Sequence, residues 1–104
     1  MSATSAGSAA LGRALTQSAA RCGVALDIRQ HRSTAWASAT FAGARHHLSL
    51  ACRPDTAVDR WLATLDEEDL PVAHQLVADI GWRRTARDAD RVTIDVEILT
   101  VETA

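Results

Sequence analysis

The chain has 104 residues, a formal net charge of −2 and 47% hydrophobic residues, which suits one compact domain and excludes both a multidomain enzyme and a disordered chain. The acidic balance argues against nucleic-acid binding, and no apolar run approaches the roughly 18 residues of a membrane-spanning helix. All eleven basic residues are Arg and 21 positions are Ala, a composition typical of a GC-rich bacterial genome. With two cysteines and no recognisable signal peptide, we expect a soluble cytoplasmic protein.

Charge is divided unevenly between the two halves of the chain. Residues 1–52 hold five Arg and one acid, Asp27, whereas residues 53–104 hold six Arg and twelve acids, four of them in the run at residues 66–69. In a single domain these opposite charges can cancel within the fold or across a self-complementary dimer. The division therefore indicates something about assembly and does not favour a nucleic-acid or membrane partner.

Apolar residues at helical spacing predict two helices. The first covers residues 8–22 and follows a tail at residues 1–7 that we expect to be disordered. Gly23 stands where a glycine commonly ends a helix. The second helix covers residues 55–66, and its apolar face is formed by Val58, Trp61, Leu62 and Leu65.

Alternating apolar and polar residues predict five strands, at residues 24–28, 34–41, 46–52, 76–83 and 92–98. A polar turn at residues 29–33 separates the first two, and a loss of phase at Leu99 and Val101 predicts a bulge or an exposed apolar end near residue 98. The α-βββ-α-ββ order favours one α+β domain over residues 8–104, a five-stranded and mostly antiparallel sheet with both helices on one face. An alternative is a duplicated helix-plus-hairpin unit, although the two halves share no residue-level repeat.

The chain carries no recognisable catalytic or cofactor motif. It lacks a P-loop, a dinucleotide fingerprint, a nucleophile elbow and the usual zinc patterns. His46 and His47 look like a metal pair, but adjacent residues of a strand point to opposite faces of a sheet. We therefore predict no metal site and no cofactor, and we favour a protein that is not an enzyme.

One face of the predicted sheet is the candidate binding surface. It would carry a tryptophan, a histidine and several charged residues: Trp36, His47, Asp79, Arg83, Asp95 and Glu97. Such a face is either exposed to solvent or packed against a partner molecule. We predict an interaction module that self-associates, as a homodimer, or that binds another protein through this face.

The alternative is a small-ligand-binding protein or a small enzyme. In that case His47 or His74 would work with Asp79 in a pocket between the second helix and the sheet, as an imidazole paired with a carboxylate. Asp79 stands out because it interrupts an apolar segment, where a carboxylate must be solvated or paired.

Overall fold

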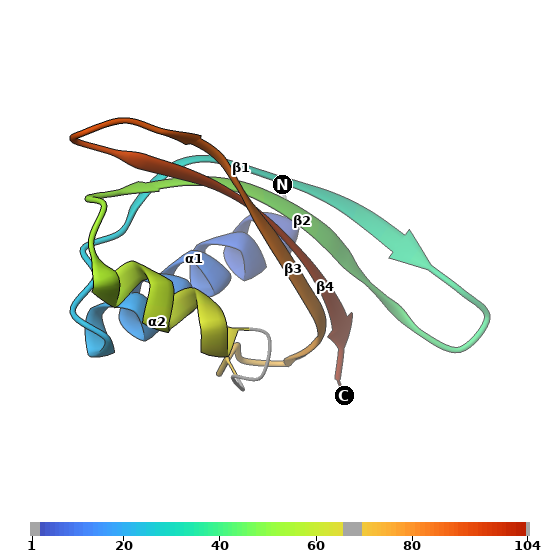
Figure 1. The fold of residues 1–104 in the computed structure, drawn as a ribbon. Coiled ribbons are helices and arrows are strands. Elements are labelled where there is room, and N and C mark those ends of the chain that lie inside the picture. Colours follow the sequence, from blue (N-terminus) through green and yellow to red (C-terminus); the bar gives the residue numbers. More distant parts are fainter. Residues whose placement is uncertain (1–2, 66–69, 104) are drawn as a thin grey trace.

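The computed structural model describes residues 3–65 and 70–103 and places them in two layers, an antiparallel sheet with both helices on one of its faces (Figure 1). The elements in chain order are α1 (Ala3–Arg21), β1 (Asp27–Ala37), β2 (Ala42–Cys52), α2 (Thr56–Leu65), β3 (Gln75–Arg87) and β4 (Val92–Glu102). The predicted α+β class is confirmed, but the sheet of the described residues has four strands and not five. The acidic run at residues 66–69 lies outside the described residues.

The first two predicted strands form one continuous strand. The polar segment at residues 29–33 continues β1 and does not form a turn. β1 lies at an edge of the sheet, and a register shift between Ile28 and Gln30 resets its alternation. Beyond that shift, Arg32 is exposed, while His31 and Ser33 are partly covered by α1. An edge strand tolerates this polarity because only part of its surface faces the core.

The bulge predicted near residue 98 is also wrong, because β4 stays in regular register throughout. Thr100 takes the next inward position after Ile98 and is only 1% exposed. The irregularity lies on the neighbouring strand, where β3 shifts between Val77 and Asp79. That shift turns Leu76 outward, opposite Val101, so Leu76 is 53% exposed and not part of the core.

The strand order β1-β2-β4-β3 makes the fold two copies of a helix followed by a hairpin. The two hairpin turns match atom for atom in their backbone bonds: Ser38 N–H donates to Phe41 O, and Asp88 N–H donates to Arg91 O. A shift of 50 positions relates these turns, and the same shift maps the β2–β4 pairing onto itself. The duplicated layout that the sequence offered as an alternative is therefore the one observed, although the side chains have diverged.

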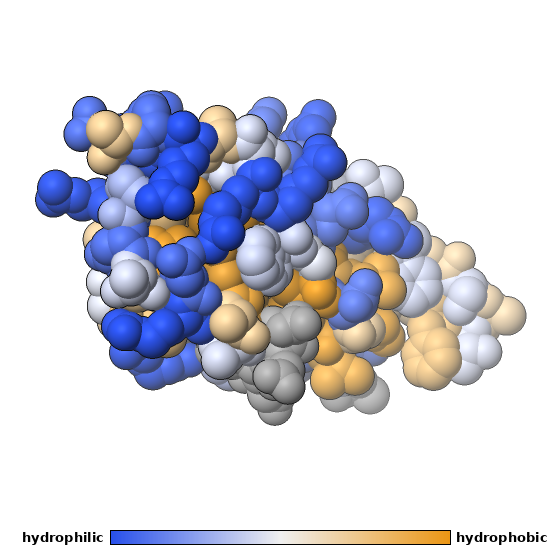
Figure 2. Space-filling view, viewed as in Figure 1, coloured by the Kyte–Doolittle hydropathy of each residue, from blue (hydrophilic) through white to orange (hydrophobic). Residues whose placement is uncertain are grey.

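The hairpins extend to opposite ends of a molecule about 46 Å long (Figure 1). The end formed by the β1–β2 turn is coloured pale to orange in the hydropathy view, whereas the end formed by the β3–β4 turn is mostly blue (Figure 2). Phe41 in the β1–β2 turn is 57% exposed. No helix among the described residues is long and apolar enough to cross a bilayer.

The core lies between the helices and the inner face of the sheet. Trp61 of α2 is fully buried, and its indole N–H donates to Ser18 Oγ of α1 at 2.8 Å, which joins the two helices. α1 begins at Ala3, earlier than predicted, and ends as predicted: Gly23 has a φ of 82°, and Val24 N–H donates to Ala19 O. With the helices fixed beneath the sheet, the opposite face is left uncovered by them.

Candidate functional site

The candidate site is the outer face of the sheet, defined as the face turned away from α1 and α2. Along β2, Leu48 and Leu50 are fully buried under the helices, so His47 and Ser49 point outward. Strand pairing then sets the outer rows: His47 lies opposite Arg32 on one side and Glu97 on the other, and Ser49 lies opposite Asp95. Within the described part of the chain, no helix covers this face (Figure 1).

Charge on the outer face is separated by strand. β1 and β2 contribute the basic side, and β3 and β4 contribute most of the acidic side. The basic residues are Arg32, Arg45 and His47, and the acidic ones are Asp79, Asp95 and Glu97. Two residues depart from this division: Asp27 lies 3.5 Å from Arg29 on the same strand, and Arg83 lies opposite Asp95.

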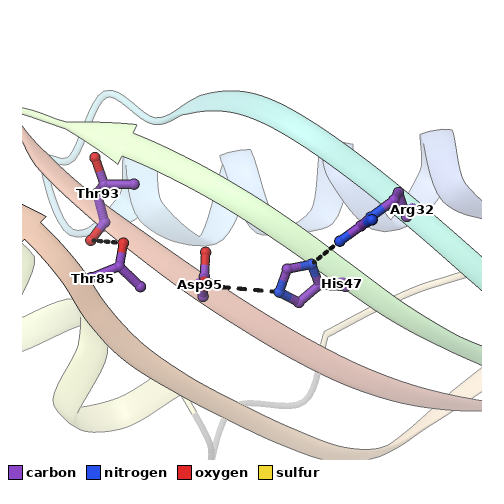
Figure 3. A network of polar contacts seen from close by, with 5 residues as sticks. All are labelled: Arg32, His47, Thr85, Thr93 and Asp95. Carbon is purple, nitrogen blue, oxygen red and sulfur yellow. Dashed lines mark hydrogen bonds and ion pairs between the residues drawn. The ribbon is translucent and has the colours of Figure 1, made fainter.

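A polar network crosses the middle of the face (Figure 3). Arg32 Nη2 lies 3.4 Å from His47 Nδ1, and His47 Nε2 lies 3.9 Å from Asp95 Oδ2. Because Arg32 can only donate, His47 Nδ1 must accept and Nε2 must carry the proton toward Asp95. At 3.9 Å that contact is too long for a hydrogen bond, so it lacks the oriented histidine–carboxylate pairing typical of a general base.

Apolar side chains gather at one end of the outer face. Trp36, Gly43, Val101 and Leu76 form one row across the four strands. Leu99 lies in the next row, opposite Arg45. The indole Nε1 of Trp36 is buried and has no hydrogen-bond partner within the described structure. The outer face therefore has a charged centre and an apolar row at one end.

The structure does not bring the proposed catalytic residues together. His74 lies in the turn between Val72 and Gln75 with a φ of 64°, and its carbonyl oxygen accepts from Thr103 N–H. Asp79 is exposed on β3, an edge strand separated from His47 on β2 by the whole of β4. His47 also faces away from the helices, so the predicted pocket between the second helix and the sheet cannot contain it.

An open cavity of about 440 Å³ does exist on the outer face, and its lining residues are His47, Gly81, Trp82, Arg83, Asp95 and Glu97. Four of these six residues were candidates for binding, and Gly81 opens the space because it has no side chain. The predicted cluster is therefore present in part, with Arg32 added by the extension of β1. No group of three or more His, Cys, Asp or Glu among the described residues is arranged to hold a metal ion.

A second histidine cluster lies on the inner face, and the sequence interpretation missed it. His46 is 1% exposed; its Nδ1 lies 2.9 Å from His31 Nε2, and its Nε2 lies 3.3 Å from Thr100 Oγ1. Burial, and to a smaller extent the nearby His31, lowers the pKa of His46 to about 4. The sequence did indicate its inward position, because His46 precedes the inward-pointing Leu48 by two residues and alternate residues of a strand point to the same face.

Comparison with known proteins yields one similar structure and no family. No family model matches the chain, and no curated protein matches it. The chain is similar to the crystal structure of the type 4 fimbrial biogenesis protein PilO from Pseudomonas aeruginosa, with a TM-score of 0.49 and 13% sequence identity. That match covers 88% of this chain and 63% of the PilO chain, so this chain spans less than two thirds of its length.

Proposed function

We propose that the protein is a non-catalytic interaction module that forms a homodimer through the outer face of its sheet. The observation that carries this proposal is the charge separation on that face, basic on β1 and β2 and acidic on β3 and β4. On a face that contacts only solvent, no physical reason segregates positive and negative side chains onto different strands. A surface that meets its own copy gains from carrying both signs in separate halves.

The geometry of such a dimer follows from the strand order. A two-fold axis in the interface, parallel to the strands and between β2 and β4, exchanges the two halves of the sheet. The basic half of one copy then lies over the acidic half of the other. This pairing uses the part of the charge difference between the two chain halves that lies on the outer face, because each half contributes one side of that face.

Apolar contacts would supply most of the affinity. Exposed ion pairs contribute little, typically 0 to about 1 kcal/mol each, and mainly fix orientation. The row of Trp36, Val101 and Leu76 adds apolar area at one end of the face, and Leu76 alone is 53% exposed. A partner would also offer an acceptor to the unpaired Trp36 Nε1.

Sedimentation velocity over a micromolar concentration series tests the proposal. We expect a dimer whose dissociation constant rises about tenfold in Arg45→Glu, in Glu97→Arg and in Trp36→Ala, about 1.4 kcal/mol for each. Combining Arg45→Glu with Glu97→Arg should recover part of the loss, because the two halves stay complementary. The matched control is Arg91→Glu in the β3–β4 turn, outside the face. A strict monomer throughout the series would overturn the proposal.

A further inference from the structure

The two edges of the sheet differ in their ability to accept another strand. Along β3, two register shifts, one between Val77 and Asp79 and one between Arg84 and Ala86, interrupt the edge. Such bulges are a common means by which proteins block edge-to-edge pairing. On β1 the single shift lies near the start, and residues 30–37 then pair with β2 without interruption. The β1 edge is therefore the regular one.

A groove runs beside this regular edge. α1 packs against β1, and between them lies a cavity of about 580 Å³. Its apolar lining comes from Ala9 and Gly12 of α1 and from Ile28 of β1. Gly12 lets α1 approach β1 closely at one side of the groove, because a Cβ at that position would lie only 3.3 Å from Ile28 Cδ1. A groove between a helix and a free strand edge is the geometry in which extended peptides bind by adding a strand.

The charge of the groove selects the partner. Arg13 and His31 line it, and none of its lining residues is acidic. The exposed Arg32 lies on the outer face of the same strand edge. A second copy of β1 placed here would bring its own Arg29 and Arg32 beside Arg13 and Arg32, which like-charge repulsion disfavours. Charge complementarity instead favours an acidic strand from a different protein.

We propose that the groove between α1 and β1 binds an extended acidic peptide segment of a partner protein, added as a fifth strand along residues 30–37. Alternate side chains of that segment would be small and apolar and enter the groove beside Ala9. The intervening side chains would be carboxylates and lie near Arg32, while Arg13 favours acidic groups at the groove itself. This site shares Arg32 with the outer face, but its groove lies on the opposite face of β1 and it does not depend on homodimer formation.

Fluorescence polarisation with a labelled, capped peptide of four Val-Glu repeats tests the proposal on the full chain. We expect saturable binding that is weakened about tenfold or more by Ala9→Trp, which fills the groove, and by Arg13→Glu, which reverses its charge. The matched control Arg60→Glu, on the exposed side of α2, should leave binding unchanged. A peptide of four Val-Lys repeats and an acidic peptide carrying central prolines should not bind, because they lack the charge or the backbone donors.

Three results would overturn the proposal: no saturable binding of the Val-Glu peptide, equal binding of the Val-Lys peptide, or equal weakening by Arg13→Glu and Arg60→Glu. If the Val-Glu peptide instead dissociates a dimer of the chain, the occupant is a second copy and the partner assignment fails. Arg45→Glu on the outer face should leave peptide binding intact, so failure of the homodimer and failure of this site are distinguished.

Discussion

The two hairpins share a backbone plan and differ in their surfaces. Both turns close with the same backbone bond and the same side-chain cap, Ser38 Oγ in one and Asp88 Oδ1 in the other. Yet residues 35–44 around the first turn include no charged residue, whereas the second turn includes Arg87, Asp88, Asp90 and Arg91. The two hairpins can therefore share one backbone structure when only their turns and their strand register match. Side-chain chemistry can then diverge freely between the halves.

The divergence is sharpest on the outer face. Under the shift of 50 positions, Arg45 corresponds to Asp95 and the neutral His47 corresponds to Glu97, so a basic residue in the first half stands where the second half has an acidic one. A symmetric fold has thereby acquired an antisymmetric charge pattern. This is the pattern that a face-to-face homodimer would use.

The two hairpins differ in backbone spacing at Gly43, whose equivalent in the second hairpin is Thr93, and substitution of Gly43 should have the greatest effect on stability. A Cβ at Gly43 would overlap the carbonyl oxygen of Thr100 on the neighbouring strand, and a backbone atom cannot move aside cheaply. We expect Gly43→Ala to lower the free energy of unfolding by about 3 kcal/mol, the upper range for overpacking. Urea denaturation measures this.

Gly81→Ala is the matched control, because nothing lies within 4 Å of a Cβ at Gly81. It should leave the free energy of unfolding within about 0.5 kcal/mol of the parent chain or raise it slightly. Equal losses in the two variants would show that the close approach at Gly43 is not the cause.

The next effect concerns His46, whose equivalent in the second half is Val96. The pKa of His46 is lowered to about 4 in the folded chain, so the unfolded chain binds the proton first as the pH falls. Stability should therefore drop between about pH 6.5 and pH 4, by about 2 kcal/mol at pH 5, and His31, whose pKa burial also lowers, acts in the same direction. Chemical denaturation at a series of pH values measures the slope.

His46→Val gives the first half the residue of the second, and we expect it to remove most of this pH dependence. His74→Asn is the control, since His74 is exposed in a turn and Asn tolerates its φ of 64°. A slope that persists in His46→Val would assign the pH dependence to other groups.

The sequence correctly predicted the elements in which apolar residues recur with a strong helical or strand periodicity. The α2 stripe of Val58, Trp61, Leu62 and Leu65 is buried as expected, and Val92 to Ile98 alternate as expected. It failed where a register shift reset the phase, as at Ile28 and Val77, because a bulge is decided by pairing with a neighbouring strand and not by local composition. The six residues predicted to share one face of the sheet do lie on its outer face, and their role in binding stays a prediction. Arg32 and Arg45 were missed because their segments were taken for turns.

Removal of either side-chain cap at the hairpin turns should change the free energy of unfolding least. Asp88 Oδ1 accepts from Asp90 N–H at 2.8 Å and from Arg91 N–H at 2.9 Å, whereas Ser38 Oγ accepts from the equivalent groups at 3.4 and 3.1 Å. A charged acceptor at shorter distance makes the stronger bonds, so Asp88→Ala should cost about 1 kcal/mol and Ser38→Ala about half as much. Thermal unfolding at neutral pH can rank the two. Asp88→Ser should fall between the parent and Asp88→Ala, because it copies the cap of the first hairpin. If Asp88→Ser is as unstable as Asp88→Ala, the matching geometry of the two turns does not extend to their energetics.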